Sequence, residues 1–257
     1  MVITVSSPGS PGTSFTDNVK DKIVVIFDVL ESNDDFESIR DLGSHLEKFG
    51  FNWNYTRNIL PFLQNCGIVN YQNVSPLCNK NFFTNIGRAY VDILKSIKIV
   101  KDEQNYPDRD NVLIAMENIQ EVIYFQCLVI MMKDKTCNYS KDFFDALLFA
   151  DRYGYIDSVE YLLIQHERGK NPDHFMETIG ETVRAYRAHE IDITVRTKTK
   201  NQDSGEAKSV NSFPYVAGNF VKAGVFIKPE DNRFSINTAR RAEVNRAIKE
   251  VTKVWQA

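Results

Sequence analysis

The sequence is poor in the residues that build metal and disulfide sites. It has 4 cysteines and 4 histidines in 257 residues, and no two cysteines are spaced as CxxC. A structural zinc site needs closely spaced pairs of ligands, so zinc and the finger folds built on it are not expected. The N-terminus also lacks the pattern of a secretion signal. We therefore expect reduced thiols in the core, no metal site, no cofactor and a cytoplasmic protein.

Long apolar runs are lacking as well. The longest, "VIYFQCLVIMM" at 122–132, is 11 residues, which is shorter than the roughly 20 residues that cross a bilayer. It predicts a buried helix, so no membrane partner is expected. The hydrophobic fraction is 43% and the charged fraction is 25%, which are the proportions of a globular protein with a sizeable core.

Charge is distributed unevenly along the chain. The net charge is −3, but residues 193–257 carry 12 Lys/Arg against 6 Asp/Glu. The C-terminal quarter is therefore basic, and the remainder is acidic. This asymmetry suggests an acidic partner for the C-terminal quarter, although basic residues that simply cluster on a terminal helix would give the same pattern.

Hydrophobic periodicity predicts a mostly helical chain. Asp17 is a candidate N-cap for the first helix, and Gly67 a candidate stop for the third. Four short segments predict strands, at 68–71, 81–85, 225–227 and 233–237, and 191–195 is strand-like. Helices are predicted at 17–32, 36–48, 53–65, 86–97, 115–133, 140–152, 156–168, 174–187, 212–223 and 238–252.

One local pattern occurs twice. "PFLQNCGIV…NFFTN" and "NFVKAGVF…RFSIN" both place a helix before a glycine, then a strand, a turn, a second strand and an Arg-containing helix. Helix, helix, helix and hairpin is the order of a winged helix. The predicted fold is mainly α (α+β), with tandem winged-helix domains joined by a helical connector. The predicted parts are a flexible N-terminus (1–16), a first winged-helix domain (17–101), a linker (102–111), and a connector with the second winged-helix domain (112–257).

Polar residues at the start of the two third helices are the candidate base contacts. In a helix-turn-helix these positions meet base edges, and Asn and Arg can pair in bidentate fashion with adenine and guanine. Nearby basic residues are candidate phosphate contacts. The same residues could also form an ordinary solvated face. The candidates are Asn52, Asn54, Tyr55, Arg57, Asn58 and Lys80 in the first domain, and Arg196, Lys198, Lys200, Asn211, Ser212, Tyr215, Asn219, Lys222, Arg233, Arg240 and Arg241 in the second.

The order of motifs resembles the N-terminal recognition half of AlwI-like type IIS restriction endonucleases and their nicking relatives. The motifs are "FFTNIGRAYVDIL", "VIYFQCLVIMMKD", "NYSKDFFDALLFADRYGYIDSVEYLLIQHERGK" and "FVKAGVFIKPEDNRFSIN", and together they cover most of the chain from about residue 17. The resemblance implies that tandem winged helices recognise an asymmetric site on double-stranded DNA. It also implies that a separate PD-(D/E)xK nuclease, as a domain or a subunit, cuts nearby with Mg²⁺.

A nuclease site is not expected in this chain. The PD-(D/E)xK motif needs an acidic residue and a strand-borne Glu/Asp-x-Lys that together hold Mg²⁺. The nearest candidates are Pro172–Asp173, Glu190, Asp192 and Lys198, but no Glu/Asp-x-Lys falls on a credible buried strand. We therefore expect DNA recognition without catalysis by this chain alone.

Two other functions remain open from the sequence. Tandem winged helices also mediate protein–protein contacts, which the acidic first three-quarters favours and the basic C-terminal quarter does not. A plasmid-type replication initiator also uses two winged helices, although a basic surface on both halves would be expected there. If DNA is the partner, Arg57→Ala should relax base preference, whereas Lys198→Ala should weaken binding evenly across sequences.

Overall fold

The computed structural model describes residues 2–6, 14–32, 35–48, 50–72, 74–171, 175–196, 212–227 and 231–256. The described chain is mostly helical, which confirms the predicted mainly-α class. It divides into two compact units. The N-terminal unit comprises residues 12–137 with 222–224, and the C-terminal unit comprises 138–221 and 225–257 with 1–11.

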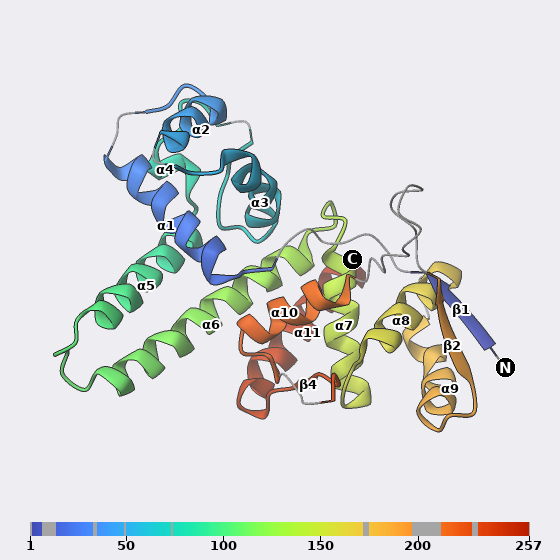
Figure 1. Cartoon of the computed structure of the whole chain (residues 1–257). Coiled ribbons are helices and arrows are strands. Elements are labelled where there is room, and N and C mark those ends of the chain that lie inside the picture. The colour runs from blue at the N-terminus through green and yellow to red at the C-terminus, as the bar shows by residue number, and fades with distance from the viewer. Residues whose placement is uncertain are drawn as a thin grey trace. The chain divides into compact units, whose positions relative to one another are not determined.

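The N-terminal unit is built from helices alone, with short backbone bridges between them (Figure 1). Phe15, Tyr90 and Tyr124 are fully buried in its core, and the Phe15 ring lies 4.5 Å from that of Tyr124 and 5.4 Å from that of Tyr90. Its elements are α1 (Asp17–Ser32), α2 (Ile39–Glu47), α3 (Trp53–Asn65), α4 (Asn79–Phe82), α5 (Asn85–Asp102) and α6 (Arg109–Lys133).

Helix α1 has the predicted bounds and the predicted buried face, because its apolar residues recur at helical spacing. Its N-terminal cap differs from the prediction. The Oγ1 atom of Thr16, one residue before Asp17, accepts a hydrogen bond from the Val19 N–H at 3.4 Å. Asp17 instead lies in the first turn, where its negative charge favours the positive end of the helix dipole.

The predicted strand at 81–85 is absent. Residues Asn79–Phe82 form the short helix α4, and only Phe83 pairs with Val69 as an isolated antiparallel bridge. The Asn81 side chain accepts a hydrogen bond from the Cys78 N–H at 2.9 Å, which begins the helical turn where the alternating pattern predicted a strand. A second bridge joins Leu77 to Phe36, in the connection between α1 and α2.

The charged segment 102–111 does not separate the two units. It contains the turn between α5 and α6, which pack side by side as a helical hairpin (Figure 1). Arg109 closes this turn by donating hydrogen bonds to the carbonyls of Val100 (3.1 Å) and Lys101 (2.6 Å). The division between units falls instead at Cys137 and Asn138. Within the described ranges, α6 is the one helix that is long and apolar enough to cross a membrane.

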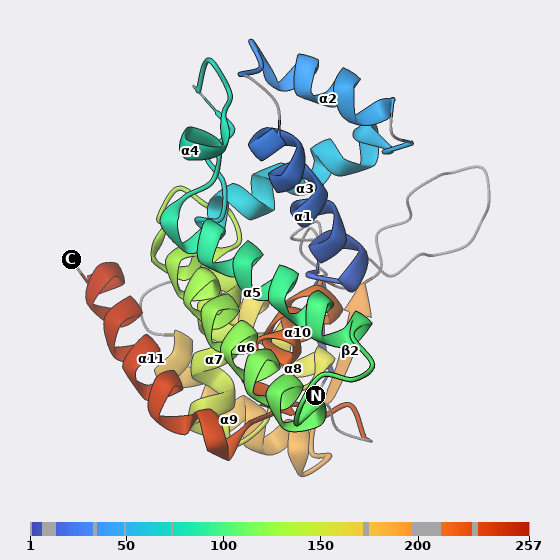
Figure 2. The same cartoon turned by 90° about the vertical axis from the view of Figure 1, so that its left-hand side faces the viewer.

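The C-terminal unit combines helices, which Figure 2 shows from a second side, with two small sheets. Helix α11 lies beside α7, and aromatic side chains fill the core, with the Phe220 ring 5.6 Å from Phe143 and 4.8 Å from Phe226. Its elements are β1 (Val2–Ser6), α7 (Ser140–Tyr153), α8 (Ser158–Lys170), α9 (Phe175–Arg187), β2 (Asp192–Arg196), α10 (Phe213–Lys222), β3 (Phe226–Ile227), β4 (Ser235–Ile236), η1 (Thr238–Arg240) and α11 (Arg241–Gln256).

The N-terminus is not wholly the flexible lead-in that was predicted. Strand β1 pairs in parallel with β2, from Val2 opposite Asp192 to Ser6 opposite Arg196. Val5 is 1% exposed, so burial of a β-branched side chain supports the pairing. The Ser/Pro/Gly-rich residues 7–13 dominated the local composition, and the partner strand lies far away in the sequence.

The hairpin predicted in the C-terminal quarter is confirmed. Phe226 pairs with Ile236 and Ile227 with Ser235, in antiparallel register. The backbone of Phe234 also bridges to Ile156, in the connection between α7 and α8. In each case a residue that follows a helix, Leu77 after α3 or Phe234 after α10, thus bridges to the connection between two earlier helices.

Candidate nucleic-acid interface

The first turn of α3 presents the exposed polar side chains Asn54, Arg57 and Asn58. Thr56, between them, is fully buried, and its N–H and hydroxyl both donate to the Asn52 carbonyl, at 3.0 and 2.9 Å. Of Tyr55 the structure describes only the helical backbone. A buried threonine therefore fixes the turn, and its exposed neighbours face outward.

Arg57 occupies a special place in α3. Pro61 lies four residues later inside the helix, and proline has no N–H to donate to the Arg57 carbonyl. Within the described ranges, the Arg57 guanidinium makes no ion pair with the protein. An exposed cation near the start of a helix, without an ion pair among the described residues, is available to an external ligand.

The segment between α3 and α5, whose two arms meet in the isolated Val69–Phe83 bridge and which is called the α3–α5 hairpin below, is anchored at its base by Thr84 and Arg88. The Thr84 hydroxyl donates to the Gly67 carbonyl at 2.5 Å and accepts from the Gly87 N–H at 3.0 Å, which begins α5. Arg88 donates to the carbonyls of Phe83 (2.6 Å) and Lys80 (3.2 Å). These bonds hold the end of α4 against α5 and leave the Lys80 side chain exposed.

Replacing Arg88 with methionine should loosen this hairpin. Methionine keeps the aliphatic stem but removes the donors, so the α4 carbonyls lose their partners, and we expect a loss of about 1–3 kcal/mol in the free energy of unfolding. Amide hydrogen exchange between residues 68 and 83 should accelerate more than exchange in α6. Arg40→Met, at an exposed arginine of α2, is the matched control. Equal effects of the two substitutions would show that Arg88 does not anchor the hairpin.

The chain around α10 repeats this order of a helix, a glycine, a paired segment and a capped helix. Gly67 after α3 and Gly224 after α10 both have positive φ, of 68° and 66°, as a left-handed C-terminal stop requires. In each case the next N–H bonds back five residues into the helix, Ile68 to the Leu63 carbonyl and Val225 to the Phe220 carbonyl, both at 2.9 Å. After the hairpin a capping side chain begins the next helix, Thr84 in one unit and Asn237 in the other.

Two predicted contact residues of the second domain belong to the core. Ser212 and Asn219 are both 0% exposed. The Ser212 hydroxyl bonds to the Tyr161 hydroxyl at 3.1 Å, and the Asn219 amide donates to the Tyr215 carbonyl at 2.9 Å. These side chains pack the unit and cannot meet base edges without unfolding it. Tyr215, which is 38% exposed, keeps an accessible ring.

The predicted cations of the second domain lie on several elements. Lys222 is exposed at the end of α10, and Arg233 is exposed just before β4. Arg241 forms an ion pair with Asp151, and Arg240 lies 3.8 Å from the Glu243 carboxylate. The Arg196 backbone lies in β2, and only its backbone is described. Lys198, Lys200 and Asn211 lie outside the described residues.

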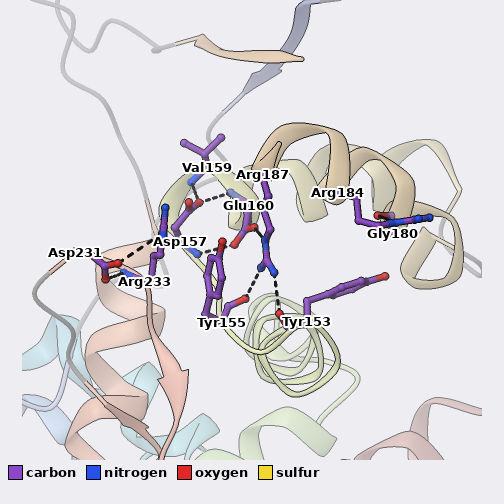
Figure 3. Close-up of polar contacts among 10 residues, drawn as sticks. All are labelled: Tyr153, Tyr155, Asp157, Val159, Glu160, Gly180, Arg184, Arg187, Asp231 and Arg233. Atoms are coloured by element: carbon purple, nitrogen blue, oxygen red, sulfur yellow. Dashed lines mark hydrogen bonds and ion pairs between the residues drawn. The ribbon is translucent and has the colours of Figure 1, made fainter. Parts of the chain in front are cut away.

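Arg233 approaches a polar cluster that the sequence did not reveal (Figure 3). The Arg187 guanidinium lies 3.7 Å from the Tyr155 ring centroid, and that of Arg233 lies 5.2 Å from it. Arg187 donates to the fully buried Glu160 carboxylate at 2.5 Å, and also to the carbonyls of Tyr153 and Tyr155. Burial raises the pKa of Glu160, and Arg187 opposes that rise.

This cluster gives Arg187 and Arg233 different roles. The Arg187 guanidinium donates to the Glu160 carboxylate and to two backbone carbonyls, and so joins α9 to the connection before α8. Its role is therefore structural. Arg233 has an exposed side chain (55%), and its ion pair with Asp231 is long at 3.7 Å. It therefore remains able to meet a phosphate. The one sequence signal for Arg187 was its position in the last turn of a predicted helix.

The candidate acidic residues do not form a metal site in the described ranges. Glu190 and Asp192 are both exposed, at the end of the turn after α9 and at the first residue of β2. Asp173 and Lys198 lie outside those ranges. No group of three or more metal-binding side chains occurs among the residues that the structure describes.

Comparison of the chain with protein-family models, curated proteins and solved structures finds no match.

Proposed function

We propose that this chain binds double-stranded DNA at a specific sequence through two winged-helix domains. In this proposal it is the target-recognition module of a type IIS restriction or nicking endonuclease, with cleavage supplied by a nuclease domain or subunit that uses Mg²⁺. The observation that carries the proposal is an order of elements that occurs twice: a helix, a glycine with positive φ, a hairpin and a capped helix. In each copy a backbone bridge joins the hairpin segment to the connection between two earlier helices.

The backbone bridges support the winged-helix assignment. A winged helix pairs the connection after its first helix with the hairpin that follows its third. The pairs Phe36–Leu77 and Ile156–Phe234 occupy those positions. In the C-terminal unit α9, β2 and residues 197–211 are then an insertion between the second helix, α8, and the third, α10.

The exposed residues divide into two groups by their chemistry. Asn54, Arg57 and Asn58 share one turn of α3 and could donate to base edges in a major groove. Lys80, Lys222 and Arg233 are exposed cations at or near the hairpins and suit phosphates, which position a protein without specifying sequence. Two different recognition domains in one chain impose no two-fold symmetry, so an asymmetric site is expected.

A gel-shift assay with a randomised duplex pool tests the proposal. Binding should select one sequence and weaken steeply between about 50 and about 200 mM salt, because neutralised phosphates release counterions. Absence of any shift at the lower salt would exclude DNA binding and would favour the alternative of a tandem winged-helix protein-interaction subunit. Uniform binding to all duplexes would exclude sequence recognition and would favour a replication-initiator-like or architectural role.

Arg57→Ala should reduce discrimination at one base position by about 1–3 kcal/mol, because one bidentate pair is lost. Lys222→Ala should instead weaken binding equally for all sequences and lower the salt slope by about one unit. Lys98→Ala, at an exposed lysine of α5 outside the proposed interface, is the control and should change neither quantity. If Arg57→Ala and Lys222→Ala have the same sequence-independent effect, the assignment of base contacts to α3 is wrong.

A further inference from the structure

Helix α6 has apolar side chains on several sides, and the other elements of its unit cover only some of them. Its 25 residues include 8 that are buried. A helix that is apolar around its whole circumference is normally enclosed by other elements. Yet α6 exposes Ile114 by 58%, Ile119 by 50% and Ile130 by 39%. These exposures are anomalous for a soluble helix of this length, and they recur along its axis.

The exposed or half-buried residues that follow one side of α6 form its outer face. Between Ala115 and Ile130 this face carries no charged residue, Ile114 lies at its margin, and Lys133 follows on the same side at the end of the helix. Glu117 lies on the opposite side of the helix, where it is bonded to Lys101 of the same helical hairpin at 2.8 Å. The members of the outer face are Ala115, Asn118, Ile119, Val122, Gln126 and Ile130.

The lack of charge on the outer face argues against two kinds of partner, a nucleic acid and a lipid bilayer. A phosphate backbone requires cations, and the outer face has none. A bilayer core disfavours the amides of Asn118 and Gln126. An uncharged face of mixed aliphatic and amide side chains suits another protein helix.

The outer face is complementary to itself about a two-fold axis beside Val122. When two copies of α6 run antiparallel about this axis, Ala115 of one lies opposite Ile130 of the other. The small side chain thus faces the large one. In the same register Ile119 lies opposite Gln126. An interface between identical copies must be self-complementary in this way.

Charges at the two ends of the helix favour the same orientation. Exposed Asp108 and Asp110 flank the start of α6, and Lys133 and exposed Lys135 flank its end. An antiparallel pair places the acidic start of each helix next to the basic end of the other, and it also opposes the two helix dipoles. A parallel pair would set like charges against each other.

We propose that the outer face of α6 is an interface for a second copy of this chain, packed antiparallel about an axis beside Val122. The contact is one helix wide, and 25 residues span roughly 37 Å. This is smaller than the interface of an obligate dimer. The dimer is therefore reversible, with a dissociation constant on the order of 10 µM. The proposal does not depend on DNA binding.

Sedimentation and light scattering between about 1 and about 200 µM test this proposal on the free protein. The wild-type mass should rise from monomer to dimer over that range. Ile119→Glu should raise the dissociation constant at least about 30-fold, because it buries a charge. Ile227→Glu, at an isoleucine of the C-terminal unit with a similar exposure of 49%, should leave the dimer unchanged. Circular dichroism confirms that each variant is folded.

Cross-linking tests the orientation. Under mild oxidation, a mixture of Ile119→Cys and Gln126→Cys chains should form the mixed disulfide in preference to either homodimer, because the two positions face each other. The proposal is overturned by a wild-type monomer at all concentrations, by a dimer that Ile119→Glu leaves intact, or by equal yields of the three disulfides. A monomer that binds neutral phosphatidylcholine vesicles would also overturn it, in favour of a membrane surface.

Discussion

Replacing Arg168 with methionine should lower the free energy of unfolding by about 3–5 kcal/mol at neutral pH, because it leaves two buried carboxylates without their cation. Arg168, on α8, donates to Asp145 at 2.6 Å and to Asp142 at 2.5 Å, and both are on α7. The side chains of Asp142 and Asp145 are only 10% and 5% exposed. The Arg168 guanidinium thus joins α8 to α7 through ion pairs with two mostly buried carboxylates.

The loss should depend on pH in a defined direction. Burial raises the pKa of Asp145 from 3.8 to about 6, although Arg168 opposes this rise. Because the folded pKa exceeds the unfolded one, the folded state binds the proton more tightly. The contribution of Asp145 to stability is therefore greatest below about pH 4 and falls as pH rises through 6. Removing Arg168 should raise the pKa of Asp145 further, so that the pH range over which its protonation stabilises the folded state becomes wider.

Urea denaturation at pH 5 and pH 8 measures both effects. The deficit of Arg168→Met relative to wild type should be smaller at pH 5, where protonation of Asp145 removes part of the uncompensated charge. Arg184→Met, at an exposed arginine of α9, is the matched control and should cost little. Adding Asp142→Asn and Asp145→Asn to Arg168→Met should restore part of the lost stability. A deficit independent of pH, or no recovery, would refute the electrostatic explanation.

Features set by local sequence could be predicted, and features set by distant contacts could not. The bounds of α1 and α3 follow from apolar spacing together with a terminal cap or glycine, and they were predicted correctly. The hairpin of β3 and β4 also follows from a local turn. Strand β1 was missed because its partner β2 is about 190 residues away in sequence. The turn at 102–111 looked like a linker because polar residues mark turns and domain boundaries alike.

The candidate site shows the same limit. Exposure of Asn54, Arg57 and Asn58 could be predicted, since they alternate with a buried Thr56 on one helical turn. Burial of Ser212 and Asn219 could not, because each is satisfied by a hydrogen bond that composition does not reveal. Polar residue type therefore predicted exposure correctly in α3 and wrongly at Ser212 and Asn219 of the second domain.

Replacing Gly87 with alanine should destabilise the N-terminal unit by about 3 kcal/mol, although alanine is the better helix former by about 1 kcal/mol. A Cβ atom at this position would lie 2.0 Å from the Ile68 carbonyl oxygen and 2.9 Å from its carbon. These are backbone atoms at the base of the hairpin, so no side chain can rotate away. The start of α5 must move instead, which disturbs the Thr84 hydroxyl bonds to Gly67 and Gly87.

Gly169→Ala provides the matched control for this prediction. Gly169 is also helical, in α8, and a Cβ there would meet no atom within 4 Å. This substitution should be neutral or stabilise the protein by up to about 1 kcal/mol, by helix propensity alone. Thermal unfolding of both variants separates the two effects. If Gly87→Ala behaves like Gly169→Ala, α5 does not pack this closely on Ile68. If Gly87→Ala unfolds early but, once cooled, gives the wild-type result in the duplex gel-shift assay, the hairpin base supports stability without positioning the first turn of α3.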